Sequence, residues 1–248
     1  MQPYFFPYIG YFQCLNAVDK YILYHNLAFI KNAWINKNFV LLKQGKKSPI
    51  IIPVIQKSSF KTINIIAIDE TQHWRNKLLN KVYLNYKKAP HFEETFKLVS
   101  DVVNKKYEFI HQITSDSIIS VKDYLKIETD IVTENNQYED IEKYFAEMGQ
   151  NMLMYEGQYL ERKVIRVLEI CKRLNAKTFI NAIGGIDLYK KDIFKSFGID
   201  LIFIKTNEEL SYQQNSTNNF IPNLSIIDVL MFNGRSKTRA MLHSYSII

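Results

Sequence analysis

The chain has 248 residues, of which 47% are hydrophobic and 14% aromatic, so we expect a packed globular fold of one large domain or two small ones. Its formal net charge of +7 comes from scattered basic residues without a basic helix, which argues against a nucleic-acid-binding protein. The two cysteines, Cys14 and Cys171, lie far apart with no metal-binding spacing, and we expect both to be core thiols. With no signal-peptide pattern and no apolar run of about eighteen residues, the sequence predicts a cytoplasmic protein without a membrane span.

The chain begins with a dense run of aromatic residues that proline and glycine interrupt. Residues 2–6 are predicted to form a short strand, Pro7 and Gly10 a turn, residues 11–18 a helix and residues 21–24 a second strand. Backbone amides at the start of such a helix favour an anion or a polar ligand. A plain βαβ unit with aromatic packing fits the same pattern, and the two interpretations stay open.

A polar segment, residues 25–38, follows the second predicted strand. Open α/β sheets place their ligands at the carboxyl ends of strands. An aromatic that can stack, such as Trp34, together with donors such as Lys31 and several asparagines, suits a nucleotide or a sugar diphosphate. His25 has an unperturbed pKa that suits a general base, although a structural histidine is the more common case.

The middle of the chain predicts a hairpin followed by helices. Residues 38–42 and 49–55 are the expected hairpin strands, with Pro53 at an edge or a bulge, and residues 62–68 are a further strand. From about residue 71 to residue 125, apolar residues such as Trp74, Leu78 and Val82 recur at helical spacing. This region is therefore expected to be a helical subdomain.

A second βαβ unit is predicted later in the chain. An amphipathic helix over residues 160–174 precedes a strand over residues 177–181, a turn at Gly184 and Gly185, a helix over residues 187–197 and a strand over residues 199–205. The glycines allow close approach of a ligand to the backbone, or they serve only as a strand-to-helix turn. The predicted fold class is a mixed α/β or α+β protein with a βαβ-containing sheet, in a single domain over residues 1–248.

The last predicted helix begins after Ser225, which can cap it, and ends at Asn233 and Gly234. Asp228 lies in its first turn, where the helix dipole favours a carboxylate. Because the rest of this helix is apolar, Asp228 is expected either to be paired in the core or to face a pocket.

Several segments of the chain resemble the WbqC-like protein family. They are residues 2–13 (QPYFFPYIGYFQ), residues 17–19 (AVD), residues 30–31 and 34–38 of one run (IK and WINKN) and residues 220–234 (FIPNLSIIDVLMFNG), with further similarity at residues 88–92, at the glycine turn and near Tyr189. The resemblance implies a protein of bacterial surface-polysaccharide (O-antigen-type) biosynthesis that transfers an amino acid or another acyl group to an amino sugar. Members commonly have two acidic residues where this chain has His25 and Asn26, so a carboxylate that binds metal or acts as a base there would be lost or replaced in this chain.

We therefore expect a transferase that moves an aminoacyl or acyl group to a nucleotide-linked amino sugar, and the alternative is a non-catalytic sugar-nucleotide-binding or scaffold protein. His25 or Asp228 would be the general base, and the absence of a recognisable nucleophile favours direct transfer. The substrate-binding candidates are Gln2, Tyr8, Gly10, Tyr11, Asn26, Lys31, Trp34, Asn36, Asn38, His91, Asn181, Gly184, Gly185, Tyr189, Asn223 and Ser225. The sequence identifies no cofactor and no metal site, and it leaves the donor and the oligomeric state open.

Overall fold

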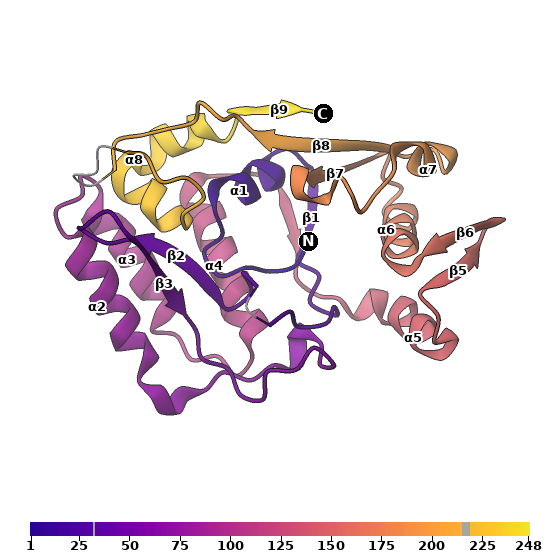
Figure 1. Ribbon diagram of the computed structural model, residues 1–248, viewed down its shortest axis with the longest axis horizontal. Helices are drawn as coiled ribbons and strands as arrows, with labels where there is room; N and C mark the ends of the chain where they lie inside the picture. The colour runs from indigo at the N-terminus through magenta and orange to yellow at the C-terminus, as the bar shows by residue number, and fades with distance from the viewer. Residues whose placement is uncertain (32, 215–218) are drawn as a thin grey trace. The chain divides into compact units, whose positions relative to one another are not determined.

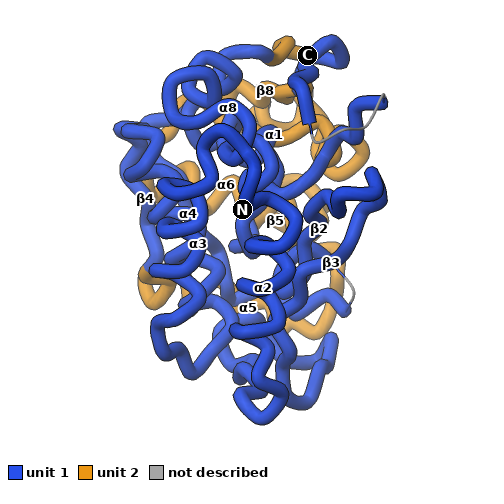
Figure 2. The backbone as a smooth tube through the Cα atoms, turned by 90° about the vertical axis from the view of Figure 1, so that its left-hand side faces the viewer, with its two compact units in different colours: residues 1–133, 206–244 blue, residues 134–205, 245–248 orange. Residues whose placement is uncertain are grey.

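The computed structural model describes residues 1–31, 33–214 and 219–248, and it has the mixed α/β character that the sequence predicts (Figure 1). Its contacts divide the chain into two compact units, which Figure 2 distinguishes by colour. Unit 1 comprises residues 1–133 and 206–244, and unit 2 comprises residues 134–205 and 245–248. The single domain over residues 1–248 stays a prediction. Within the described ranges, no helix is both long and apolar enough to traverse a lipid bilayer.

The helices of unit 1 are α1 (Ile9–Asn16), α2 (Trp74–Tyr86), α3 (Phe92–Val103), α4 (Ile110–Leu125) and α8 (Ile226–Met241), with short 3₁₀ turns at η1 (Ile63–Ile65) and η2 (Glu70–Gln72). The helical region predicted between residues 71 and 125 is confirmed as α2, α3 and α4. On α2, Trp74, Leu78, Val82 and Tyr86 are all buried, because residues four apart lie on one face of a helix.

The strands of unit 1 are β1 (Lys20–Ile22), β2 (Lys37–Leu41), β3 (Lys47–Ile51) and β4 (Asp130–Val132). Strands β2 and β3 form the predicted hairpin, antiparallel with Phe39 opposite Pro49. Its turn contains Gly45 at a φ of 74°, a left-handed conformation that glycine adopts without steric cost. Strand β1 pairs in parallel with β4, which lies more than a hundred residues later in the chain.

The segment before α1 is not a strand, so the first predicted βαβ unit is wrong. Residues 2–6 join no ladder, helix α1 begins at Ile9, and β1 has β4 as its neighbour. Pro3 and Pro7 have no N–H to donate to a sheet, and Phe6 has a φ of 40°, outside the range of a strand.

The strand predicted over residues 62–68 is also wrong. This stretch contains the η1 turn, followed by isolated bridges from Ala67 to Phe109 and from Ile68 to Val54. Its buried isoleucines are Ile63, Ile66 and Ile68, which do not follow the strict alternation of a strand. The β-branched composition therefore reflects burial in the core and not ladder formation.

Unit 2 contains η3 (Asn136–Tyr138), α5 (Glu139–Met148), β5 (Met152–Tyr155), β6 (Gln158–Glu161), α6 (Arg162–Arg173), β7 (Thr178–Ala182), η4 (Ile183–Gly185), α7 (Lys191–Ser196), β8 (Asp200–Thr206) and β9 (Tyr245–Ile247). Strands β7 and β8 run parallel with α7 between them, which confirms the second βαβ unit. Strand β9 completes this sheet beside β8. The predicted helix over residues 160–174 is α6, and the β5–β6 hairpin precedes it.

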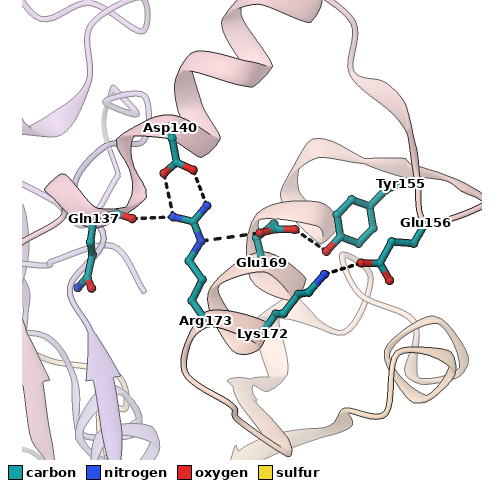
Figure 3. Close-up of polar contacts among 7 residues, drawn as sticks. All are labelled: Gln137, Asp140, Tyr155, Glu156, Glu169, Lys172 and Arg173. Atoms are coloured by element: carbon teal, nitrogen blue, oxygen red, sulfur yellow. Dashed lines mark hydrogen bonds and ion pairs between the residues drawn. The ribbon is translucent and has the colours of Figure 1, made fainter.

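Ion pairs on α6 connect it to α5 within unit 2 (Figure 3). The Arg173 guanidinium donates to the two carboxylate oxygens of Asp140 at 2.8 and 2.5 Å and to the Gln137 carbonyl at 2.6 Å. On the same helix, Glu169 accepts a hydrogen bond of 2.6 Å from the Tyr155 hydroxyl. Because the Asp140 side chain is 67% exposed, water screens the pair, and we interpret these contacts as structural.

Candidate functional site

The segment that leads into α1 is held in a strained conformation by buried polar side chains. Phe6 is fully buried with its φ at 40°, a value that a bulky residue adopts only when its surroundings impose it. Its N–H donates to Ser117 Oγ at 3.1 Å, and its carbonyl accepts from Asn38 Nδ2 at 2.6 Å and from Ser225 Oγ at 2.8 Å. Residues from β2, α4 and the start of α8 therefore fix this turn.

Three polar residues that the sequence predicts to bind substrate have side chains that form hydrogen bonds with backbone groups. Asn38 Nδ2 also donates to the Phe5 carbonyl at 3.0 Å, and Asn36 Nδ2 donates to the Ile52 carbonyl at 2.8 Å. Ser225 Oγ accepts from the N–H of Ile227 at 3.3 Å, which confirms the predicted helix cap. All three are buried, so they act on the shape of the site, and a direct contact with substrate stays a prediction.

Helix α1 begins against the aromatic ring of Tyr8. A Cβ added to Gly10 would lie 2.5 Å from the Tyr8 ring and 2.8 Å from Thr206 Oγ1, so no larger residue fits there without a shift. Burial raises the pKa of Tyr8 to about 12, which keeps its phenol protonated and able to donate. Tyr11 is buried and donates to the Gln2 carbonyl at 3.0 Å. These four nominated residues thus lie together at the start of α1.

His25 follows β1 and lies beside a second histidine that the sequence did not nominate. Its Nε2 is 2.9 Å from the Thr133 carbonyl, and because a carbonyl can only accept, Nε2 carries the proton. The ring of His111, from the first turn of α4, has its centroid 4.6 Å from that of His25. Burial, and then the proximity of His25, lowers the pKa of His111 to about 4, so its imidazole is neutral at pH 7.

Amide and hydroxyl groups adjoin the two rings. Asn64 Nδ2 donates to Asn26 Oδ1 at 3.3 Å, Thr62 Oγ1 donates to Asn64 Oδ1 at 2.5 Å, and the N–H of Asn64 donates to the His25 carbonyl at 3.2 Å. All these side chains except that of the buried His25 are half-buried. We call His25, Asn26, Thr62, Asn64 and His111 the imidazole cluster.

Three members of the imidazole cluster, Thr62, Asn64 and His111, are not marked by any pattern in the sequence. Thr62 and Asn64 lie in a stretch whose composition predicts a strand, and His111 lies at the start of a helix marked mainly by its apolar stripe. The three are brought to His25 by backbone pairing of residues 62–68 with the chain around Leu27 on one side and Phe109 on the other.

The polar segment also presents an indole to solvent. Trp34 is 41% exposed and packs edge-on against Phe39, with ring centroids 5.8 Å apart. The ammonium group of Lys37 lies 5.5 Å from the centroid of the Phe39 ring, and Lys31 is exposed. An exposed indole can stack on a base or a sugar, and that role of Trp34 stays a prediction.

Asp228 is paired in the core, one of the two outcomes expected for it. Its carboxylate is fully buried and accepts from the hydroxyls of Tyr86 and Tyr212, each at 2.7 Å, and from Gln214 Nε2 at 3.0 Å. Burial raises the pKa of this carboxyl, and the three hydrogen bonds oppose the rise. The arrangement fastens residues 212–214 to α8, and a role of Asp228 as a base stays a prediction.

The predicted end of the last helix is a kink, because α8 continues to Met241. Gly234 has a φ of 59° and a ψ of −167° inside the helix, and a Cβ there would lie 2.5 Å from the His91 ring. His91 Nδ1 lies 3.0 Å from Glu94 Oε1 and the ring covers the kink. Asn223 is an exposed residue with a φ of 58° in the loop before α8.

The remaining nominated residues belong to unit 2. A Cβ on Gly185 would lie 2.3 Å from Asn181 Nδ2, so this glycine makes room for the Asn181 amide near the end of β7. A Cβ on Gly184 would meet no other atom of the described residues within 4 Å. The Tyr189 ring packs edge-on against Phe179, with centroids 5.6 Å apart. Close packing explains Gly185 and Tyr189. A pocket role for these two, for Asn181 or for Gly184 stays a prediction.

The comparisons with known proteins agree with the resemblance seen in the sequence. The model of the WbqC-like protein family matches residues 2–240. A relative described as "Uncharacterized protein Rv1507c", from Mycobacterium tuberculosis (strain ATCC 25618 / H37Rv), is 22% identical over 236 residues, which cover 93% of this chain and 90% of the relative. No solved structure matches the chain. The similarity therefore extends from the strained opening segment to α8.

Proposed function

The chain belongs to the WbqC-like protein family, and from that premise we propose that it is a transferase of bacterial surface-polysaccharide biosynthesis that moves an aminoacyl or acyl group to a nucleotide-linked amino sugar. The observation that carries the proposal is the imidazole cluster, in which two histidine rings lie 4.6 Å apart beside half-buried amides and a hydroxyl. A neutral imidazole accepts a proton at pH 7, and amide and hydroxyl groups suit the hydroxyls of a sugar.

In the proposed reaction, the amino group of the sugar attacks the carbonyl carbon of an activated acyl donor. A C–N bond forms, and the bond to the donor's leaving group breaks with its electron pair going to that group. The proton that the amine loses passes to an imidazole of the cluster. His25 is oriented for this by its bond to Thr133, and His111, whose pKa burial lowers to about 4, stays neutral beside it.

Binding of the acceptor would use the polar segment that follows His25 in the chain. The exposed face of Trp34 would stack on the nucleoside base or the sugar, and Lys31 would neutralise phosphate. We assign the proton to the imidazole cluster and not to Asp228, because that carboxylate has no exposed surface and already accepts three hydrogen bonds.

One observation favours the alternative, a sugar-nucleotide-binding or scaffold protein without chemistry. Asn36, Asn38, Ser225 and Asp228 all make internal hydrogen bonds, so the polar groups available to a ligand are fewer than the sequence suggests. Binding needs only a few well-placed polar groups and an aromatic surface, whereas acyl transfer also needs a base.

The first test is thermal unfolding of the whole chain against nucleotide-linked amino sugars, each alone and with an acyl-CoA or an aminoacyl donor, followed by a search for the N-acylated product by mass spectrometry. A ligand at a hundred times its Kd adds about 2.7 kcal/mol. That raises the midpoint by roughly 5–10 °C in a chain of this size.

Variants then separate the two functions. We expect His25→Ala and His111→Ala to keep the ligand-induced shift and to lower turnover by roughly a hundredfold. His243→Ala, at an exposed position on the same unit, is the matched control and should change neither quantity. A saturable shift with no product from any donor would establish the binding protein in place of the transferase, and full turnover in His25→Ala and His111→Ala would remove the imidazole cluster from the mechanism.

A further inference from the structure

One stretch of unit 1 has lysines but no acidic residues to balance them. Residues 20–68 contain eight lysines and no aspartate or glutamate, whereas the whole chain has a net charge of only +7. This stretch includes β1, the β2–β3 hairpin and the loops on either side of them. An excess of one sign over so long a segment indicates an anionic partner.

The same stretch exposes large apolar side chains. Phe60 is 99% exposed, Ile30 is 51% exposed and Ile55 is 48% exposed. Each of the three lies within two residues of a lysine, namely Lys31, Lys57 or Lys61, so exposed apolar and cationic groups adjoin one another in this stretch.

Backbone pairing brings these residues to one edge of unit 1. Ala28 bridges Thr62 in the antiparallel sense, and the N–H of Phe29 donates to the Lys61 carbonyl at 2.8 Å. Ile30 and Lys31 directly follow Phe29, and Phe60 directly precedes Lys61, so they adjoin this pairing. The Lys61 ammonium group also donates to Gln56 Oε1 at 2.7 Å, which brings in the segment with Ile55 and Lys57. We call Ile30, Lys31, Ile55, Lys57 and Phe60 the basic apolar edge.

We propose that the basic apolar edge binds the surface of an anionic lipid bilayer. Aromatic and aliphatic side chains enter the boundary between headgroups and acyl chains, while lysine ammonium groups remain at the level of the lipid phosphates. The described residues of the edge include both kinds of side chain and no carboxylate that would repel the headgroups. Binding of this kind does not depend on whether the chain transfers an acyl group.

The edge fits other occupants less well. A second copy of the chain would oppose lysines to lysines, because a two-fold interface brings the same surface together. Single-stranded nucleic acid binds on aromatic rings, and two of the apolar residues here, Ile30 and Ile55, are aliphatic and do not stack on bases.

The test is co-sedimentation of the whole chain with vesicles of equal parts phosphatidylcholine and phosphatidylglycerol, compared with vesicles of phosphatidylcholine alone. We expect binding to the anionic vesicles that weakens as salt is raised. Phe60→Ser should weaken it by about tenfold or more. Tyr159→Ser, which removes an aromatic ring that is 67% exposed on unit 2, should not change it.

The charge is tested separately. Lys31→Gln with Lys57→Gln should weaken vesicle binding by roughly thirtyfold. Lys77→Gln with Lys88→Gln removes the same charge from exposed positions on or next to α2 and should have a much smaller effect. Equal loss with both lysine pairs, absence of binding to anionic vesicles, or binding to single-stranded DNA but not to vesicles would each overturn the proposal.

Discussion

Removing the Asp228 carboxylate should destabilise unit 1 strongly, because three donors point at it in the core. The hydroxyls of Tyr86 and Tyr212 are both 2.7 Å from its oxygens, and Gln214 Nε2 is at 3.0 Å. Asp228 has no exposed surface, so water cannot replace it. In Asp228→Ala the Tyr86 and Tyr212 hydroxyls lose their acceptor, whereas Gln214 keeps its bond of 2.9 Å to the Ile221 carbonyl.

The expected cost follows from counting the donors left unpaired. Each buried donor without a partner costs about 1–3 kcal/mol, so Asp228→Ala should lower the free energy of unfolding by about 3–5 kcal/mol. Tyr212→Phe removes one charge-assisted bond and should cost about 1.5–3 kcal/mol. Tyr86→Phe should cost more than Tyr212→Phe, because the Tyr86 hydroxyl also accepts from the N–H of Leu41 at 2.7 Å.

Urea unfolding followed by far-UV circular dichroism measures these costs. The double variant of Asp228→Ala with Tyr212→Phe should be more stable than the sum of the single losses predicts, by about 1–2 kcal/mol. Asp187→Ala, at an exposed position, is the control and should stay within about 0.5 kcal/mol of the parent. A loss below about 1 kcal/mol for Asp228→Ala, or additive losses in the double variant, would refute the buried network.

Two further predictions concern the kink of α8 and the imidazole cluster. Gly234→Ala should lower the free energy of unfolding by about 3 kcal/mol, because it combines a glycine-only backbone conformation with a clash against the His91 ring. The control Gly184→Ala, with open space around it, should lower it by less than about 1 kcal/mol. Equal losses of stability for the two variants in urea would contradict this. The pKa of His111 is about 4 in the folded chain and 6.5 ordinarily, so between these pH values the unfolded chain binds a proton that the folded chain does not. The free energy of unfolding should therefore fall by about 2 kcal/mol as the pH is lowered from 6.5 towards 4, after allowance for partial exposure of the ring. His111→Asn should flatten that pH dependence and His243→Asn should not, and an unchanged slope in His111→Asn would refute the assignment.

The local pattern of the sequence correctly predicted the elements that are held together by contacts between residues close in the chain. The stripe of Trp74, Leu78 and Val82 predicted α2, and the second βαβ unit appeared as β7, α7 and β8. The cap at Ser225 was also predicted correctly, since a hydroxyl before an apolar helix binds a nearby backbone N–H whatever the rest of the fold does. The β2–β3 hairpin succeeded for the same reason, because its two strands adjoin in the chain.

The opening segment shows where local pattern failed. Residues 2–6 have a strand-like composition, but their polar groups are met by Ser117, Asn38 and Ser225, which lie up to 219 residues away in the chain. Only long-range contacts can hold Phe6 at a positive φ, and no pattern of near neighbours reports them. The prediction of the candidate site was incomplete for the same reason. His111 lies beside His25 only because residues 62–68 pair with the chain around Leu27 and with the residues just before α4.

The sequence by itself determined the family, the mixed α/β class, the helical middle of the chain and the placing of His25 and Trp34 after a strand. Tertiary structure alone decided which polar residues are available for chemistry. It placed Asp228 among donors in the core and His25 beside a second imidazole. The physical reason is that burial and hydrogen-bond partners depend on segments distant in the chain, whereas secondary structure follows largely from residues close together in it.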